Sequence, residues 1–366
     1  MCGCAGDHHP ADGRGSPGMI RWGIIGCGGI ARRRVLPART EMRATRFVAV
    51  MDADPRVTRE VAAETGTRPC FSVEEILDDP QIQAVYIATP VYLHHPQALL
   101  AAAKDKHVLL EKPLALNVEQ AREVVETFED SDLLLMEGYM MKFHSLNCRA
   151  AEMVARGDLG KPVFLRAQLT CWYPEIPGAW RQNPSLGGGG ALMDMATHLF
   201  DLLEEICGSP IVEVTTFAAT QTFSYPVEDS SVTLLRFQNG AFGVAEAFYN
   251  IPDVAAQGRL EVYGTNGSIL AEGTIGQDPG GSMYAFLSPA EKGYDALQQR
   301  APSDLQRQVI AAPPVNIYAA EFDYFSGCIA EDRPPAKSSG RQGLHILEVA
   351  SAAYESARTG HAIRLT

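Results

Sequence analysis

Short apolar runs alternate with amphipathic stretches along the first part of the chain. Each apolar run ends at a polar residue, a glycine or a threonine–proline pair. The runs occupy residues 20–25, 47–51, 84–88, 108–110 and 133–136. Helical periodicity fills the intervals, at residues 56–65, 73–77, 95–103 and 118–128. This alternation is typical of βαβ units, so the pattern predicts a parallel sheet whose ligands bind beyond the carboxyl ends of its strands.

The second part of the chain has a different pattern, in which most strands follow one another without an intervening helix. Strands are predicted at residues 163–170, 211–220, 231–237, 242–249, 259–262 and 268–270. The dipeptides Asn239-Gly240 and Asn266-Gly267 are hairpin signals, and strands joined by such short turns are antiparallel. Helices are predicted at 318–327 and 343–359. Residues 273–314 have no clear period, and we interpret them as a long excursion over the site.

Composition narrows the classes of function. The formal charge of −13 argues against a nucleic-acid partner, because phosphates require a basic surface. No apolar run approaches the roughly 20 residues needed to span a bilayer, so no membrane partner is expected. The eight cysteines are scattered and lack the spacing of a disulfide framework, which favours a reducing, cytoplasmic setting.

A glycine-rich turn follows the first apolar run. Gly26 permits a tight turn, Gly28 and Gly29 let the backbone approach a pyrophosphate, and Ile30 and Ala31 open the next helix. The helix N-terminus offers free N–H groups and a positive dipole end to phosphates. We interpret this turn as a dinucleotide site in preference to a merely structural turn, because it lies between a strand and a helix.

Asp52 follows the second apolar run and indicates the cofactor. A carboxylate at this position binds the adenosine ribose hydroxyls and repels a 2′-phosphate, so the sequence predicts NAD, with NADP the less favoured cofactor. The next residue is Ala53, although Arg56 and Arg59 are near. The alternative is that Asp52 caps a helix.

Three further residues carry the expected chemistry. Lys112 stands in Glu111-Lys112-Pro113 at the end of an apolar run, and a glycine run at 187–190 precedes Asp194 and His198. Oxidising a secondary alcohol requires a base, for which His198 is suited, and a cation near the oxygen, which Lys112 can supply. Asp194 can orient His198 or bind a neighbouring hydroxyl. The alternatives are a surface lysine, a core histidine and a helix-capping aspartate.

These motifs together resemble the glucose-fructose oxidoreductase/inositol dehydrogenase (Gfo/Idh/MocA) family over roughly residues 19–366. The resemblance rests on the glycine turn, Glu111-Lys112-Pro113, the segment from Gly188 through Asp194 to Asp201, and the chain's last helices. It implies an α/β fold: a Rossmann NAD-binding domain, then an α+β domain with a large, open, mostly antiparallel sheet. We expect the first domain at 19–138 and the second at 139–366, with the C-terminal helices packed back on the first.

Residues 1–18 are expected to form a flexible tail. The tail contains Cys2, Cys4, His8 and His9, but nothing would hold metal ligands on so short a segment. No Cys or His pair elsewhere has the ligand spacing of a zinc site, so no metal is expected.

The resemblance implies roles for Lys112, Asp194 and His198 in catalysis, and it adds further candidates for the cofactor and substrate sites. The cofactor candidates are Thr89, Pro90, His94, Glu111, Lys112, Trp180 and Arg181, where the tryptophan has a core position as its alternative. Tyr139 and Lys142 follow the apolar run at 133–136, and from that position we expect them to line the substrate pocket beside Lys112, Asp194 and His198.

The predicted function is hydride transfer between NAD(H) and a secondary alcohol or ketone of a sugar, cyclitol or related polyol. One alternative is an NAD-dependent glycosidase that oxidises its substrate transiently, and another is a non-catalytic NAD-binding regulator. An acid–base set such as Lys112, Asp194 and His198 argues against the regulator. A large sheet face without helical cover would find a partner, so a homodimer or homotetramer is expected.

Overall fold

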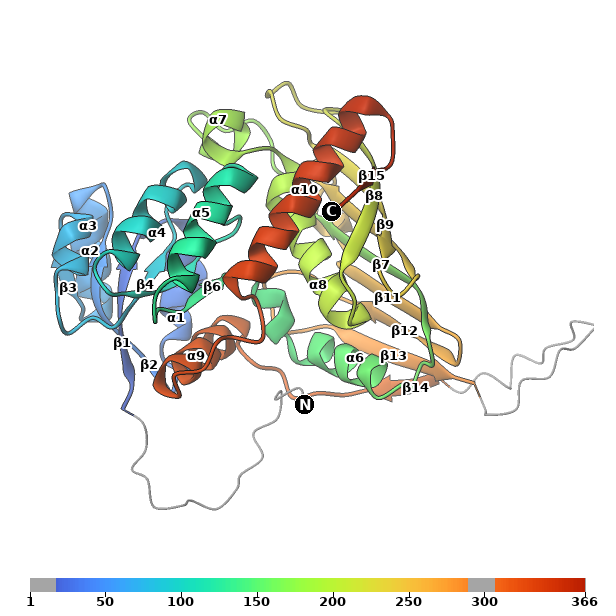
Figure 1. The fold of residues 1–366 in the computed structure, drawn as a ribbon, viewed down its shortest axis with the longest axis horizontal. Coiled ribbons are helices and arrows are strands. Elements are labelled where there is room, and N and C mark those ends of the chain that lie inside the picture. Colours follow the sequence, from blue (N-terminus) through green and yellow to red (C-terminus); the bar gives the residue numbers. More distant parts are fainter. Residues whose placement is uncertain (1–17, 289–306, 366) are drawn as a thin grey trace, which may run out of the picture.

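Two sheets organise the computed structural model, which describes residues 18–288 and 307–365 (Figure 1). The first sheet has six parallel strands in the order β3-β2-β1-β4-β5-β6. These strands are β1 (Ile20–Ile25), β2 (Thr45–Met51), β3 (Arg68–Cys70), β4 (Ala84–Ile87), β5 (His107–Leu110) and β6 (Leu135–Glu137). The strand order reverses beside β1, which places a ligand crevice at the carboxyl ends of β1 and β4.

The helices of the first domain begin and end where local chemistry directs. They are η1 (Ala31–Val35), α1 (Leu36–Ala38), α2 (Pro55–Thr65), α3 (Val73–Leu77), η2 (Val91–Leu93), α4 (His94–Ala102) and α5 (Val118–Glu129). The Asp54 side chain caps α2 by accepting from the Arg56 N–H, and Gly66 ends that helix in the left-handed conformation. Asn117 caps α5 in the same way. The parallel sheet and four helices predicted from the sequence are confirmed.

The second sheet has nine strands in the order β14-β13-β12-β11-β7-β10-β9-β8-β15. The strands are β7 (Pro162–Thr170), β8 (Ile211–Ala219), β9 (Ser230–Phe237), β10 (Phe242–Phe248), β11 (Arg259–Gly264), β12 (Gly267–Glu272), β13 (Ser282–Leu287), β14 (Arg307–Ile310) and β15 (Ile363–Arg364). Only β7 and β10 pair in parallel; the remaining pairs of described strands are antiparallel, as the two hairpin turns predicted.

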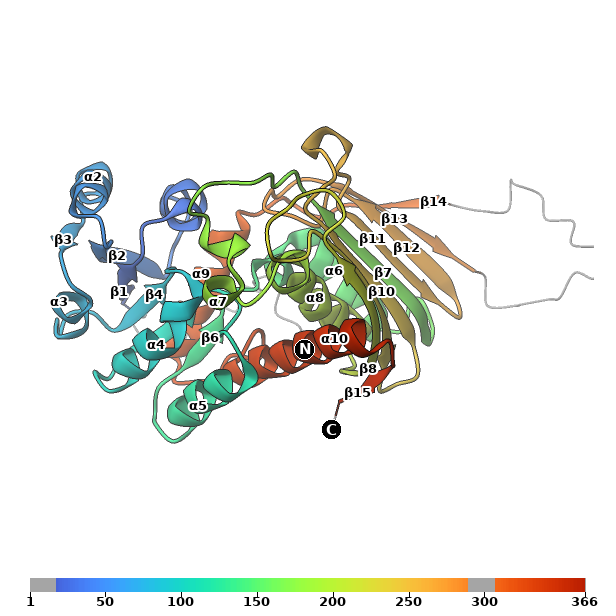
Figure 2. The same cartoon turned by 90° about the horizontal axis from the view of Figure 1, so that it is seen from above.

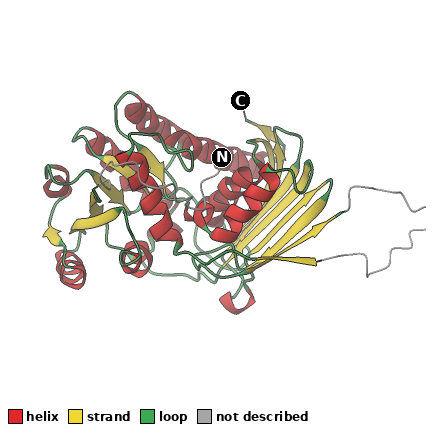
Figure 3. Ribbon diagram, turned by 90° about the horizontal axis from the view of Figure 1, so that it is seen from below, coloured by secondary structure: helices red, strands yellow, loops and turns green. Residues whose placement is uncertain are grey.

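Helices cover one face of this nine-stranded sheet and leave the other open. The second domain contributes η3 (Met140–Phe143), α6 (Ser145–Ala155), η4 (Trp180–Gln182), α7 (Pro184–Gly187), η5 (Leu192–Ala196), α8 (Thr197–Cys207), η6 (Asp253–Ala255), α9 (Ile317–Ala330) and α10 (Gly340–Thr359). Helices α6, α8 and α10 lie on the same side of the sheet, and no described helix lies on its opposite side (Figure 2). The same one-sided arrangement is visible from below (Figure 3).

Helix α9 returns from the second half of the chain to the first sheet. Its Phe322 ring packs edge-on against Trp22, Phe47 and Tyr86, with ring centroids 5.1–5.3 Å apart. The Trp22 indole N–H donates to Ser326 Oγ at 3.0 Å. These contacts bury α9 against strands β1, β2 and β4, so both halves of the chain share one hydrophobic core.

Residues 273–314 differ from the sequence expectation. Their described part contains strands β13 and β14, which extend the sheet at its edge, so the interpretation of the whole segment as an irregular excursion is wrong. The pattern was obscured because glycines precede β13. The loop before β13 does reach the first domain, where Arg34 binds Gln277 and Asp278. Residues 289–306 and the predicted tail up to residue 17 lie outside the described residues.

Candidate active site

The central feature of the site is an ion pair between the two domains. Lys112 follows β5 almost directly, and Asp194 lies in η5 just before α8. Lys112 Nζ lies 2.7 Å from Asp194 Oδ1, and the ammonium also donates to the Asp194 backbone oxygen. The Lys112 side chain is 10% exposed and that of Asp194 25%, so the pair is shielded but not fully closed to solvent. The alternative of a surface lysine is wrong, because burial and pairing fix the ammonium.

Two more side chains hold Asp194. Arg181 Nε donates to Oδ1 at 3.2 Å, and its guanidinium stacks on Trp180 at 4.2 Å. The Tyr249 hydroxyl donates to Oδ2 at 2.7 Å. Burial alone would raise the pKa of Asp194, but the cations of Lys112 and Arg181 hold that pKa well below its usual range. Asp194 is therefore an anion that the Tyr249 hydroxyl and the cations of Lys112 and Arg181 hold in place, and it does not cap α8.

His198 lies on the first turn of α8, on the inner side of the cluster. The residue is 6% exposed, and its ring packs edge-on against Tyr139 with centroids 5.5 Å apart. Burial lowers the pKa of His198 well below its usual value; the positive charges of Lys112 and Arg181 lower it further, while Asp194 opposes them. The imidazole is therefore neutral at neutral pH, which is the form that accepts a proton. Its Nδ1 atom is buried and has no hydrogen-bond partner within the described chain.

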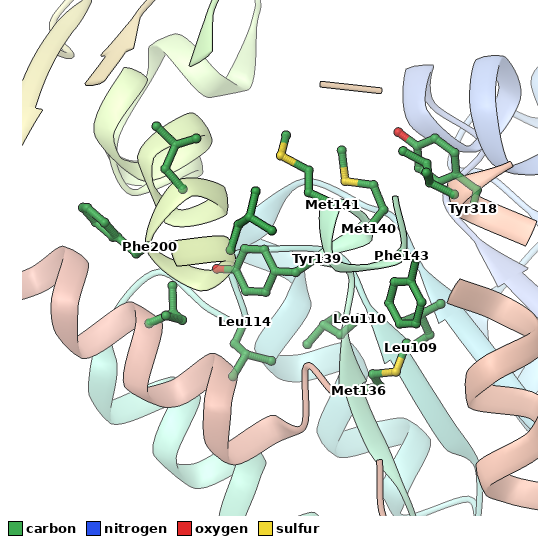
Figure 4. Close-up of a cluster of buried hydrophobic side chains, with 14 of the residues drawn as sticks. Leu109, Leu110, Leu114, Met136, Tyr139, Met140, Met141, Phe143, Phe200 and Tyr318 are labelled. Carbon is green, nitrogen blue, oxygen red and sulfur yellow. The ribbon is translucent and has the colours of Figure 1, made fainter. Parts of the chain in front are cut away.

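Tyr139 and Lys142 occupy positions other than the one expected for them. Tyr139 is 1% exposed, and its hydroxyl points toward helix α8, into the interior (Figure 4). Lys142 pairs with Asp201 at 2.7 Å and lines a separate cavity. Of the candidate substrate residues, the structure brings Lys112, Asp194 and His198 together, while Tyr139 contacts the buried side of His198.

The glycine turn has the shape that a dinucleotide requires. Gly26 has φ +97°, and a Cβ there would lie 2.8 Å from the Ala88 carbonyl, so only glycine fits. A Cβ at Gly28 would meet nothing within 4 Å, which leaves the backbone open to a pyrophosphate. Gly29 lies under the Arg33 guanidinium, which donates to the Gly29 carbonyl at 3.2 Å. The sequence reasoning missed Arg33, although a basic residue one turn into this helix is a usable signal.

Asp52 lies beside this turn and does not cap a helix. Its Oδ2 accepts from the Cys27 N–H and its Oδ1 from the Asp54 N–H, both at 2.9 Å. The two nearby arginines are engaged elsewhere: Arg56 binds Asp54, and Arg59 stacks on Phe71 at 5.1 Å. Backbone N–H groups therefore hold both oxygens of the Asp52 carboxylate beside the glycine turn.

The remaining cofactor candidates line the carboxyl ends of β4 and β5. Buried His94 joins these ends, because one ring nitrogen lies 2.8 Å from the Pro113 oxygen and the other 2.9 Å from the Thr89 oxygen. Burial lowers the pKa of His94 to about 4. Thr89 donates to Gln97, and Pro90 precedes η2. Glu111 accepts from the Tyr86 hydroxyl, and burial raises the pKa of its carboxyl.

Tyr249 is the functional residue that sequence reasoning missed most clearly. It follows β10 directly and is 1% exposed, with its ring 4.9 Å from Tyr173. Its polar tip reaches Asp194 across 55 positions of sequence. The available signal was a tyrosine at a strand end, where a buried hydroxyl requires a partner.

Comparison with known proteins identifies the family. Residues 20–139 match the oxidoreductase family with an NAD-binding Rossmann fold, and residues 148–270 match the GFO/IDH/MocA C-terminal domain. The chain belongs to the Gfo/Idh/MocA family. As a member of this family it is an oxidoreductase, and the fold class predicted from the sequence is confirmed.

Individual Gfo/Idh/MocA relatives match along nearly their whole length. The chain is 29% identical over 351 residues to 1,5-anhydro-D-fructose reductase of Ensifer adhaerens, covering 95% of this chain and 99% of the relative. It is 29% identical over 348 residues to D-xylose 1-dehydrogenase (NADP(+)) 2 of Haloferax volcanii, covering 94% and 100%. A crystal structure of aldose-aldose oxidoreductase from Caulobacter crescentus, complexed with glycerol, superposes with a TM-score of 0.84 at 27% identity, covering 95% and 100%.

Metal sites and membrane-spanning helices are both absent from the described part of this Gfo/Idh/MocA chain. Among residues 18–288 and 307–365, no group of three or more His, Cys, Asp or Glu residues is arranged to hold a metal ion. No helix in the described part of the chain is long and apolar enough to cross a membrane.

Proposed function

We propose that the chain is an NAD(H)-dependent oxidoreductase that transfers a hydride between nicotinamide C4 and a secondary alcohol or ketone of a sugar, cyclitol or related polyol. The observation that carries the proposal is the meeting of Lys112 from the first domain with Asp194 of the second at 2.7 Å, beside His198. The names of the relatives, an anhydrofructose reductase and a xylose dehydrogenase, support a polyhydroxylated substrate.

Each of the three residues has a distinct role in the proposed reaction. When bound, the nicotinamide supplies the hydride acceptor or donor. His198 takes the hydroxyl proton during oxidation and returns it during reduction, because its imidazole is neutral and lies beside Lys112 and Asp194. Lys112 stabilises the negative charge that grows on the substrate oxygen. Asp194 holds the Lys112 ammonium in place, and Arg181 and Tyr249 fix Asp194 in turn.

The cofactor we propose is NAD in preference to NADP. Asp52 is a carboxylate at the ribose position, and Arg56 and Arg59 are occupied by Asp54 and Phe71. A 2′-phosphate would meet the like charge of Asp52 there. The xylose dehydrogenase relative is named for NADP(+), so the preference belongs to this chain's own residues and not to the family.

We propose a homodimer or homotetramer that buries the open face of the nine-stranded sheet. Large apolar side chains stand on this face, with Phe217 80%, Leu234 52% and Phe242 50% exposed. They surround paired charges such as Arg166 with Glu246, at 3.0 Å. An apolar face with satisfied charges suits an isologous interface. Light scattering that showed a monomer at micromolar concentration would contradict this proposal.

We propose a cytoplasmic location because no disulfide joins the cysteines of the described residues. Six of the eight cysteines lie there, and most of them are buried. Buried cysteines outside any disulfide suit a reducing compartment. Recovery of the native chain with the periplasmic or secreted fraction of its cells would contradict this proposal.

One experiment tests the activity itself. The purified enzyme is assayed against inositols, aldoses, sugar acids and keto-sugars, with NAD(H) and NADP(H), at the NADH absorbance band. Stoichiometric formation of NADH with an alcohol, or its consumption with a ketone, is the expected result. Release of the aglycone from a glycoside without net NADH would instead favour the glycosidase, and NAD binding without turnover of any compound would favour the regulator.

A further inference from the structure

A cavity lies beside helix α8, outside the Lys112–Asp194 cluster. Its volume is about 410 Å³. Residues of η3, α8 and α10 line it, among them Lys142, Asp201, Glu204, Glu205, Arg341 and His345. Two of the lining side chains are almost fully buried, Lys142 at 3% and Asp201 at 2% exposure, and they pair at 2.7 Å. The cavity therefore extends from partly exposed charged side chains at its mouth to an ion pair in the protein interior.

Polar groups continue from this ion pair to the active site. Asp201 follows His198 by three positions on α8, so both side chains lie on the same side of that helix. Opposite them, at the end of β6, are Glu137 at 0% and Tyr139 at 1% exposure. The Tyr139 ring contacts His198 edge-on, and its hydroxyl, which points toward α8, interacts with Glu137 and Thr197 (Figure 4).

Several buried atoms along this line lack a hydrogen bond of standard geometry within the described chain. They are His198 Nδ1, both carboxyl oxygens of Glu137 and Asp201 Oδ2. A buried polar group without a hydrogen bond is destabilising, so a cluster of them calls for a functional reason. Helix α10 seals the cluster on one side: a Cβ at Gly343 would lie 1.8 Å from Glu137 Oε2.

The charges around the two acids make them exchangeable proton carriers. Burial raises the pKa of Asp201 to about 7, Glu204 and Glu205 act in the same direction, and Lys142 opposes them. Burial and the charge of Asp201 raise the pKa of Glu137 well above its usual value, against Lys142 and Lys112. The other charged neighbours are Glu321 of α9, which interacts with Asp201, and Lys337, which pairs with Glu205. Burial therefore favours the protonated form of both carboxyls.

We propose that Glu137 and Asp201 form a proton relay that connects His198, by way of the Tyr139 hydroxyl, with water in the cavity beside α8. The inference rests on the proposed function, because it serves the proton of that hydride transfer. In oxidation, the substrate O–H bond breaks and its proton goes to His198, while the C–H electron pair leaves as hydride to the nicotinamide. His198, which accepts that proton on Nε2, then gives its Nδ1 proton by way of the Tyr139 hydroxyl to Glu137. Glu137 passes one proton to Asp201, and Asp201 releases one proton to the cavity. Each carrier takes one proton and passes one on, and exchange of the imidazole proton from Nε2 to Nδ1 restores the starting tautomer before the next turnover.

The test compares two relay variants with a matched control. Glu137→Gln and Asp201→Asn keep the shape of each side chain and remove its acid. Glu321→Gln is the control, because Glu321 is also a buried carboxyl with a raised pKa, at 2% exposure, and its charge also acts on Asp201, but it neither contacts His198 nor lines the cavity. It therefore controls for the loss of a buried charge near Asp201. Stopped-flow absorbance follows NADH and a pH indicator together in weak buffer, with NAD and a sugar that the wild type oxidises.

In the wild type, proton release should follow NADH formation without delay. In both relay variants the rate of proton release should be about tenfold or more lower than the rate of NADH formation. The value of kcat should fall, while the KM values should stay unchanged. Glu321→Gln should match the wild type. If Asp201→Asn does not fold because Lys142 loses its partner, Glu137→Gln carries the test.

Prompt proton release in Glu137→Gln would overturn the relay, as would an equal delay in the Glu321→Gln control, since that result would assign these acids a structural role. A wild type that oxidises no sugar in the panel would overturn the proposed function instead, and the relay with it.

Discussion

Tyr249→Phe is a sharp perturbation of the candidate site, because it removes a single oxygen. That oxygen donates to Asp194 Oδ2 at 2.7 Å, while Lys112 and Arg181 hold Oδ1. Without the hydroxyl, the carboxylate is held on one side only and can rotate. Lys112, which Asp194 positions, would then lose its fixed place beside the substrate oxygen.

The size of the effect follows from the type of bond. A hydrogen bond to a charged group contributes about 1.5–3 kcal/mol. Because two cations still hold Asp194, we expect a loss near the lower value. A loss of ~1.4 kcal/mol corresponds to about a tenfold fall in kcat/KM. Most of this fall should be in kcat, because the hydroxyl acts on Lys112 and not on substrate binding.

The assay compares Tyr249→Phe with Tyr225→Phe as a matched control. The Tyr225 hydroxyl donates to the Tyr173 backbone oxygen at 3.1 Å and does not touch Asp194. Both variants lose the same atom from a buried ring in the same region. Unchanged kcat/KM in Tyr249→Phe, or an equal fall in Tyr225→Phe, would refute the reasoning about Asp194.

Three other predictions concern the cofactor and pH. Asp52→Ala should narrow the preference for NAD over NADP by removing repulsion of the 2′-phosphate; an NADP preference in the wild type would contradict the assignment. In the oxidation direction, kcat/KM should fall at acid pH as His198 becomes protonated, and because its pKa is lowered, the fall should begin below pH ~6.5. Burial raises the pKa of Glu321, so the folded chain keeps a proton that the unfolded chain releases above about pH 4.3. Stability is therefore full below that pH and declines as pH rises toward the folded pKa, by up to about 1.4 kcal/mol per pH unit, and Glu321→Gln should flatten this decline in thermal melts.

The sequence predicts those parts of the fold that local patterns encode. Apolar runs at 20–25 and 84–88 predict β1 and β4, because a parallel strand buried on both faces is apolar throughout. No apolar run predicts strand β3, because it has three residues, two of them exposed, and contains Pro69. Its position is set by pairing with β2 and not by its own composition.

The candidate site was predictable where motif and strand end coincide, as at Lys112. Contacts between distant segments were not, because nothing local to Tyr249 or Lys142 shows which carboxylate each will meet. Tyr249 reaches Asp194 in η5, whereas Lys142 pairs with Asp201 in α8, the helix that follows directly. These pairings are decided by how η3, η5, α8 and β10 pack together, which no single stretch of sequence encodes.

The central claim is that Lys112 and His198 perform the chemistry while the glycine turn and Asp52 bind the cofactor. The most direct measurement is turnover beside NAD affinity in His198→Ala and Lys112→Ala. We expect kcat to fall by roughly 10²-fold or more in His198→Ala and at least as far in Lys112→Ala, with NAD still bound by both. Near-normal turnover in His198→Ala would remove the histidine from the reaction, and loss of NAD binding in both variants would show that these residues position the cofactor instead.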